Sequence, residues 1–145
     1  MEQRLSIITL GVQDLVKSRA FYDALGWKVA SEDQSEEIIA YDLLSMTLCL
    51  YPLEKLNEDA KVSVTAQKHA SFTIAYNVKT PEDVDLTLTE AVKAGGTLIK
   101  PAEKVFWGGY SGYFSDIDGY LWEVAHNPFS KLGTNGEFQW NGIEA

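Results

Sequence analysis

A single acidic residue, Glu123, stands inside an apolar stretch near the end of the chain, LWEVA at residues 121–125. Removing an ionised carboxylate from water is costly unless a partner compensates, so strands rarely bury such groups. Glu123 is therefore expected to face a ligand, a metal ion, a hydrogen-bond donor or solvent. In an apolar cleft its charged form is disfavoured, as a general acid or base working near neutral pH requires. Glu123 is the candidate catalytic residue.

Other residues whose side chains could take part in catalysis or metal binding fit structural roles better. Asp116, Asp118 and Gly119 form a D-x-D-G sequence, but no glutamate-terminated calcium-binding loop follows, so a tight turn is predicted. Ser111 in GYSG lacks the spacing of a nucleophile elbow. Cys49 lies within TLCLY, where a small core side chain is predicted rather than a reactive thiol.

The composition is that of a globular protein with an acidic surface. Of 145 residues, 46% are hydrophobic, and 21 Asp and Glu against 12 Lys and Arg give a formal net charge of -9. This charge repels phosphate backbones and disfavours nucleic-acid binding. No apolar run approaches the roughly 18 residues that a membrane span needs. With one cysteine and no signal-peptide pattern at the N-terminus, no intrachain disulfide and a cytoplasmic location are expected.

Two segments with the same order of elements follow each other along the chain. The first is expected to begin with a strand at residues 5–12 and a helix at residues 15–25, which Asp14 caps and Gly26 ends. The second is expected to begin with a strand at residues 71–78. Further strands are predicted at residues 27–31, 37–44 and 46–51 of the first segment and at 97–101, 108–114 and 120–125 of the second.

The helix of the second segment has clear boundaries. Thr80 caps it, Pro81 occupies its first position, and Gly95 follows its end. Because neither copy could bury its sheet face alone, we predict one domain over residues 1–145. It consists of a first module at residues 1–64, a second module at residues 65–130 and a C-terminal tail at residues 131–145, with a polar connection at residues 52–67.

Three stretches carry a resemblance to a known family: VQDLVKSRAFYDALGW, PEDVDLTLTEAVKAGG and WGGYSGYFSDIDGYLWEVAHNP. On these the sequence resembles the vicinal oxygen chelate superfamily, which contains glyoxalase I, bleomycin-resistance proteins and extradiol dioxygenases. The resemblance implies an α+β fold in which two βαβββ modules form curled sheets around a ligand cleft. It also implies pairing into a homodimer, because proteins of this superfamily commonly form dimers.

Metal-using members of that superfamily place one ligand on the first strand and one on the last strand of each module. By correspondence these positions fall on Ile7, on Thr73, within residues 47–51 and on Glu123. Glu123 alone matches a metal ligand, whereas catalytic sites supply three or four protein groups. The comparison therefore predicts no metal site and no cofactor.

A relocated divalent metal site that combines Glu123 with His69 or His126 stays open as an alternative. His126 lies three residues beyond Glu123, and this odd offset places the two side chains on opposite faces of a strand. His69 shares parity with Thr73 but would lie about 13 Å further along the strand. We expect His69 to be exposed at a strand entrance and His126 to pair at a strand end.

The resemblance and strand alternation together predict which residues line the cleft. Side chains that share parity with the superfamily's ligand positions face the cleft, whereas Leu10, Val12 and Trp122 pack under the helices. Aromatic residues before the last strand are expected to wall the same space or to fill the core, and a tyrosine hydroxyl near Glu123 would satisfy its carboxylate. The predicted ligand-binding residues are Ile7, Thr9, Thr73, Ala75, Trp107, Tyr110, Tyr113, Leu121 and Glu123.

Three functions fit this pattern. The favoured one is a protein that binds a small organic molecule in the cleft without the usual metal, similar to the drug-resistance members. The second is a lyase, isomerase or dioxygenase-type enzyme that uses Glu123 as a base or in a relocated metal site. The third is an interaction module with a vestigial cleft. The tail, with Phe138, Trp140 and Ile143, is expected to fold over a groove or to cover a dimer interface.

Overall fold

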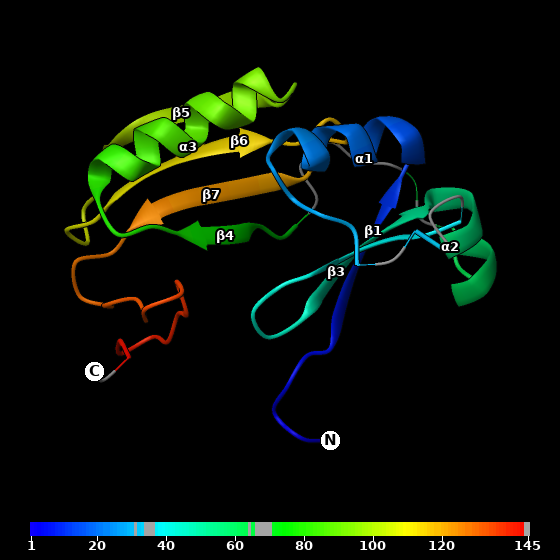
Figure 1. Cartoon of the computed structure of the whole chain (residues 1–145), viewed down its shortest axis with the longest axis horizontal. Coiled ribbons are helices and arrows are strands. Elements are labelled where there is room, and N and C mark those ends of the chain that lie inside the picture. The colour runs from blue at the N-terminus through cyan, green and yellow to red at the C-terminus, as the bar shows by residue number, and fades with distance from the viewer. Residues whose placement is uncertain (31, 34–36, 64, 66–70, 144–145) are drawn as a thin grey trace. The chain divides into compact units, whose positions relative to one another are not determined.

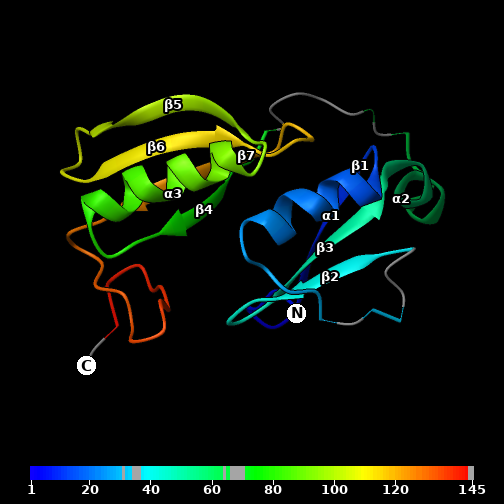
Figure 2. The ribbon, with the colours of Figure 1, turned by 45° about the horizontal axis from the view of Figure 1, so that its top comes forward.

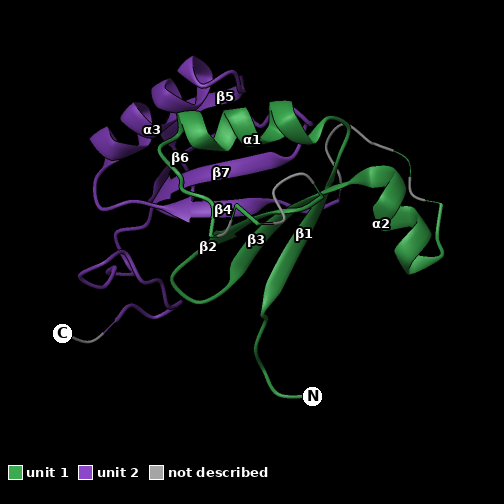
Figure 3. Ribbon diagram, turned by 45° about the vertical axis from the view of Figure 1, so that its right-hand side comes forward, with its two compact units in different colours: residues 1–67 green, residues 68–145 purple. Residues whose placement is uncertain are grey.

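The chain forms two compact units, Met1–Gln67 and Lys68–Ala145, which Figure 3 colours separately. The structure is a computed structural model that describes residues 1–30, 32–33, 37–63, 65 and 71–143. One unit contains a three-stranded sheet and the other a four-stranded sheet, so the predicted α+β class is confirmed. None of the helices in the described ranges is long and apolar enough to cross a membrane.

The first unit combines a mixed sheet with two helices. Strands β1 and β3 run parallel, and β2 pairs antiparallel with β3, giving the order β1-β3-β2 (Figure 2). Leu10 and Val12 on β1 are buried, whereas Ile7 and Thr9 are exposed, as the alternation predicts. The elements are β1 (Ile7–Val12), α1 (Leu15–Ala24), β2 (Ile39–Asp42), β3 (Thr47–Pro52) and α2 (Leu53–Ala60).

Helix α1 is anchored at its start and through one aromatic face. The Asp14 carboxylate accepts a hydrogen bond from the Lys17 backbone N–H at 3.1 Å and so caps the helix. Tyr22 is fully buried and lies 5.4 Å from the ring of Trp27 and 5.7 Å from the ring of Tyr41. These rings join the helix to β2.

One expectation for the first unit was wrong, and one helix was not anticipated. Residues 27–30 do not form the predicted strand; the Ala30 N–H donates one backbone bond to Ala40 on β2 at 2.8 Å. The predicted polar connection contains helix α2, because Leu53 and Leu56 find an apolar surface at Gly11 of β1. A Cβ at Gly11 would stand 2.7 Å from the Leu53 side chain, so the bare backbone allows this contact.

Cys49 on β3 is buried, with 4% of its surface exposed. Burial raises the pKa of its thiol, and the charge of Asp42 is a second cause.

Because the thiolate is the reactive form, we expect labelling of Cys49 by 4,4′-dithiodipyridine at pH 8 to be about tenfold slower or more in the native protein than in urea. The folded chain holds this proton more tightly, so the stability contribution of Cys49 is present below its ordinary pKa of 9.0 and declines as the pH rises above it. If absorbance traces showed equal labelling rates in the native protein and in urea, the buried position of Cys49 would be contradicted.

The second unit is a four-stranded sheet with one helix against one face (Figure 1). The strand order is β4-β7-β6-β5; β4 and β7 are parallel and the other pairs are antiparallel. The elements are β4 (Ile74–Asn77), α3 (Pro81–Lys93), β5 (Thr97–Lys104), β6 (Tyr110–Ser115) and β7 (Leu121–His126). The C-terminal segment, residues 127–143, continues from β7.

Helix α3 follows its predicted boundaries and covers the core of this unit. The Thr80 hydroxyl accepts a hydrogen bond from the Asp83 N–H at 3.1 Å, and Pro81 begins the helix. Its buried residues include Val84 and Leu88, and on the sheet Trp122 is buried with its ring stacked 6.0 Å from Phe114. Because Trp122 serves this core, the alternate residues of β7, Glu123 among them, face the other side of the sheet.

Candidate functional site

Glu123 lies in the middle of the sheet, in a row of residues that crosses all four strands. On β7 it pairs with Ala75 of β4 on one side and with Tyr113 of β6 on the other, and Tyr113 pairs in turn with Lys100 of β5. Glu123 is half-buried. Its carboxylate therefore stands on the sheet face opposite α3.

Tyr113 is the residue opposite Glu123 on the neighbouring strand β6. Burial raises the pKa of the Tyr113 hydroxyl, and the negative charge of the nearby Glu123 raises it further. The ion pairs among the described residues do not include Glu123; Lys100 directs its Nζ to Glu103 at 2.9 Å. The carboxylate thus stands beside a tyrosine and has no cationic partner among the described ion pairs.

A pocket of about 710 Å³ opens beside Glu123. Its walls come from β4, from β7, from the turn between β5 and β6, and from the C-terminal segment. Because one wall is sheet and another is the chain's last segment, the pocket combines residues far apart in sequence. The lining residues are Ala75, Asn77, Trp107, Glu123, Ala125, Asn127, Phe129, Ser130, Phe138, Trp140 and Asn141.

Trp107 reaches the pocket from a tight turn. The Val105 N–H donates to the Gly109 carbonyl at 3.0 Å, and the Gly108 N–H donates to the Val105 carbonyl at 2.9 Å. A Cβ at Gly109 would overlap the indole of Trp107 and stand 2.8 Å from the His126 carbonyl. The ring therefore lies directly against the glycine backbone, and any side chain at position 109 would displace it.

The C-terminal segment is turned back by a chain of hydrogen bonds that starts at Asn127. The Asn127 Oδ1 accepts from the Phe129 N–H at 2.9 Å, and its Nδ2 donates to the Ser130 hydroxyl at 3.1 Å. Ser130 is buried, and its hydroxyl donates to the Trp140 carbonyl at 2.5 Å. A further bond joins the Ile143 N–H to the Lys131 carbonyl at 3.0 Å. These contacts fix Trp140 at the pocket.

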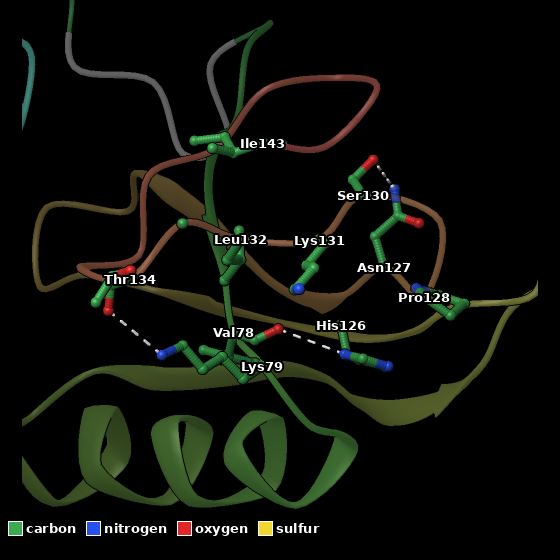
Figure 4. A pocket seen from close by; sticks show the side chains of 11 residues that line it. Val78, Lys79, His126, Asn127, Pro128, Ser130, Lys131, Leu132, Thr134 and Ile143 are labelled. Atoms are coloured by element: carbon green, nitrogen blue, oxygen red, sulfur yellow. Dashed lines mark hydrogen bonds between the residues drawn. The ribbon is translucent and has the colours of Figure 1, made fainter. Parts of the chain in front are cut away.

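A second pocket, of about 680 Å³, lies at the carboxyl ends of β4 and β7 (Figure 4). His126 Nδ1 lies 3.4 Å from the Val78 carbonyl, and the Lys79 Nζ donates to the Thr134 carbonyl at 3.5 Å. His126 thus pairs at the strand end and lines this pocket, whereas Glu123 lines the first one. The odd offset thus directs the two side chains to different pockets, as strand alternation predicts.

The comparison with known proteins is consistent with these elements. The sequence profile of the Glyoxalase/Bleomycin resistance protein/Dioxygenase superfamily matches residues 4–124. The chain belongs to this superfamily. The matched region includes Glu123 and ends before the C-terminal segment. No match was found among curated proteins.

Solved structures of the superfamily share the fold. A glyoxalase-related enzyme from Fulvimarina pelagi is 34% identical with a TM-score of 0.89, over 97% of this chain and 100% of that chain. A mutant fosfomycin resistance protein from Listeria monocytogenes, solved with Mn(II) and 1S,2S-dihydroxypropylphosphonic acid, is 25% identical with a TM-score of 0.64, over 86% of this chain and 90% of that chain. Lactoylglutathione lyase from Agrobacterium tumefaciens, at 19% identity and a TM-score of 0.66 over 88% of this chain and 96% of that chain, is similar in fold alone.

The residues around Glu123 do not fit the catalytic metal that is found in the superfamily. In the described part of the chain, no group of three or more His, Cys, Asp or Glu side chains could hold an ion. The pocket itself offers one carboxylate and the amides of Asn77, Asn127 and Asn141. Catalytic divalent sites use three or four protein ligands that include imidazoles, thiolates or carboxylates.

The structure brings four of the predicted ligand-binding residues together. Ala75, Trp107 and Glu123 line the first pocket, and Tyr113 is the cross-strand neighbour of Glu123. Tyr110 does not join them: its hydroxyl donates to Asp85 of α3 at 3.1 Å, because even alternation turns it to the helix side of the sheet.

The remaining predicted residues lie elsewhere. Thr73 is exposed just before β4, and Leu121 starts β7; neither is among the residues that line the pocket. Ile7 and Thr9 are on β1 of the first unit and are exposed. His69 lies outside the described residues.

The C-terminal segment was expected to fold over a groove or to cover a dimer interface, but the sequence did not identify this pocket. Phe129, Ser130, Phe138, Trp140 and Asn141 all line it. The available signal was the presence of large apolar residues in a polar segment. The position of the segment depends on the hydrogen bond from Ser130 to the Trp140 carbonyl, which no local pattern reveals.

Proposed function

We propose that this superfamily member binds a small organic molecule in the pocket beside Glu123, without the divalent metal that other members use. The observation that carries the proposal is the position of Glu123: half-buried, opposite Tyr113 in the sheet, and lining a pocket walled by aromatic side chains. Ligand sites generally combine a mostly apolar wall with a few polar groups that orient the ligand.

The dimensions and lining of the pocket support an organic ligand. Its volume of about 710 Å³ falls within the range of about 300–1,000 Å³ typical of small-molecule sites. Trp107, Phe138 and Trp140 supply apolar area, and the asparagine amides supply donors and acceptors in the same wall. A metal would gain little here, since neutral amides bind divalent ions weakly compared with carboxylates and imidazoles.

A second candidate function is catalysis with Glu123 as a general base. A half-buried carboxylate that faces a pocket and has no cationic partner among the described ion pairs can accept a proton from a bound substrate. The Fulvimarina relative, described as a glyoxalase-related enzyme, makes this candidate worth testing.

The proposal is tested by a thermal-shift screen of metabolite classes and of Ni, Zn, Mn and Fe salts on the wild-type protein. A ligand that binds the native state selectively stabilises it, by about 2.7 kcal/mol at a hundredfold excess over Kd, and so raises the melting temperature. We expect organic compounds, and not the metal salts, to give such shifts. Glu123→Gln should reduce the shift given by a compound that contacts the carboxylate, whereas Glu90→Gln, on the exposed face of α3, should not.

Three results decide between the candidates. Stoichiometric, tight binding of a metal in calorimetric titration would contradict the metal-independent site. A compound shift of equal size in wild type and Glu123→Gln would place the ligand away from Glu123. Turnover of a compound found in the screen, lost in Glu123→Gln while binding is retained, would establish the catalytic candidate. The homodimer expected from the resemblance is checked on the same sample by light scattering.

A further inference from the structure

We infer that the ligand of the pocket beside Glu123 is an organic cation, in which a protonated amine or a related positive group is attached to a flat apolar portion. This inference rests on the proposed function and adds the chemical class of the ligand. It follows from the charge of the pocket, from the kind of apolar groups around it, and from the way in which those groups are fixed.

The charge of the pocket is negative and is not compensated by the protein. Among the described residues that line it, Glu123 is the sole charged side chain. Lys100, the cation in the same cross-strand row, directs its Nζ to Glu103 at 2.9 Å. A bound cation would therefore meet a carboxylate that has no cationic partner among the described ion pairs. The formal net charge of -9 adds long-range attraction.

The apolar groups are aromatic rings rather than aliphatic chains. Four of them line the pocket and remain accessible, with exposed fractions of 36% for Trp107, 71% for Phe129, 42% for Phe138 and 81% for Trp140. Several large exposed apolar side chains around one hollow mark a binding site rather than a random surface. The face of an aromatic ring attracts a cation that lies within about 6 Å of its centre, most strongly for tryptophan.

Two of the rings lie against glycine backbone. The indole of Trp107 lies on the bare backbone of Gly109, and Phe129 approaches Gly108 so closely that a Cβ there would stand 3.1 Å from its ring. The hydroxyl of Ser130 donates to the Trp140 carbonyl and so holds the backbone of that residue at the pocket. A ring held in place before binding, as that of Trp107 is, loses little conformational freedom when a ligand enters, which favours selective recognition.

Other ligand charges fit this pocket less well. An anion would be repelled by Glu123, and the second pocket suits it better, because two lysines, Lys79 and Lys131, line that pocket and no Asp or Glu is among its described lining residues. A neutral flat molecule would contact the rings but would leave the carboxylate without a charged partner. The combination of carboxylate and rings favours a cation.

The test compares three probes that share one ring and differ in charge: 2-phenylethylamine, 2-phenylethanol and 3-phenylpropanoate. Their affinities for the full chain are measured at low ionic strength by protein-detected NMR titration. We expect the amine to bind about tenfold more tightly than the alcohol, and the carboxylate more weakly than either at this pocket. In Glu123→Gln the amine should lose about tenfold in affinity while the alcohol changes by less than about twofold.

Controls separate local recognition from general attraction to an acidic protein. Glu90→Gln removes the same charge from the exposed surface of α3 and should leave the amine affinity within about twofold of wild type, because screened surface charges act weakly at a distance. Equal affinity of the amine and the alcohol for wild type would overturn the cation inference and leave the small-molecule site intact. An equal loss of amine affinity in Glu90→Gln and Glu123→Gln would also overturn the cation inference, as would a lack of binding by all three probes. The metabolite screen tests the proposed function independently of these probes.

Discussion

Replacement of Gly112 by valine is expected to lower the free energy of unfolding of the second unit by about 3 kcal/mol. Gly112 lies on β6 beneath α3. A Cβ at this position would stand 2.7 Å from the Leu88 side chain, 2.8 Å from the Lys100 carbonyl and 2.9 Å from the Ala102 nitrogen. The leucine can rotate away, but the two backbone atoms of β5 cannot move without breaking the β5–β6 pairing. Helix α3 and the sheet can therefore pack this closely only when residue 112 is a glycine.

Urea unfolding followed by tryptophan fluorescence measures this effect. Thr97→Val, at an exposed strand position of β5, is the control, because it places the same valine side chain in a strand by exchanging one β-branched residue for another of nearly the same shape. We expect its midpoint to stay near that of wild type and the midpoint of Gly112→Val to fall sharply at an unchanged slope. An unchanged midpoint for Gly112→Val would show that α3 does not pack against β6 as described.

Removing two rings of the C-terminal segment is expected to abolish most ligand affinity while sparing the fold. In the double variant Phe138→Ala/Trp140→Ala, the pocket loses two aromatic walls, and truncating such contacts typically costs about 2 kcal/mol or more, which is at least roughly thirtyfold in affinity. The side chains are 42% and 81% exposed, so the free energy of unfolding should change little. The measurement is the affinity for 2-phenylethylamine or for a compound from the metabolite screen.

Phe106→Ala is the control for this double variant. Phe106 is a fully exposed aromatic residue in the turn beside Trp107 and is not among the residues that line the pocket. Its replacement should leave affinity unchanged. Wild-type affinity in the double variant, or an equal loss in Phe106→Ala, would mean that the C-terminal segment does not form a wall of the binding site.

Local sequence signals were sufficient for much of the second unit. Thr80 and Pro81 defined the start of α3 because capping depends on adjacent residues. The alternation of Trp122 and Glu123 identified the two faces of β7, since side chains on a strand point to opposite sides at each step. The same rule separated Glu123 from His126. Each of these features is determined within one turn of helix or a few residues of strand.

Features that depend on distant partners could not be predicted in the same way. Tyr110 was assigned to the ligand face, but its hydroxyl bonds to Asp85, which lies 25 residues earlier in the chain. Helix α2 was missed because its two leucines become significant only beside Gly11. The wall formed by Trp140 depends on a hydrogen bond to Ser130. In each case the deciding contact is tertiary.

Membership in the superfamily defines the scaffold but does not by itself supply the chemistry. Of the residues that correspond to metal ligands, Glu123 is the one that matches, and its neighbours in the pocket are amides and aromatic rings. Glu123 pairs with Tyr113 of β6 in the sheet and takes part in none of the ion pairs among the described residues. We therefore propose Glu123 as a recognition group for an organic ligand.

The most direct test of this claim is a crystal structure of the protein with the organic compound that gives the largest thermal shift. We expect electron density for the compound between the Trp107 and Trp140 rings, with a polar or charged group at hydrogen-bonding distance from the Glu123 carboxylate. A metal ion coordinated by that carboxylate, or a compound bound away from Glu123, would contradict it.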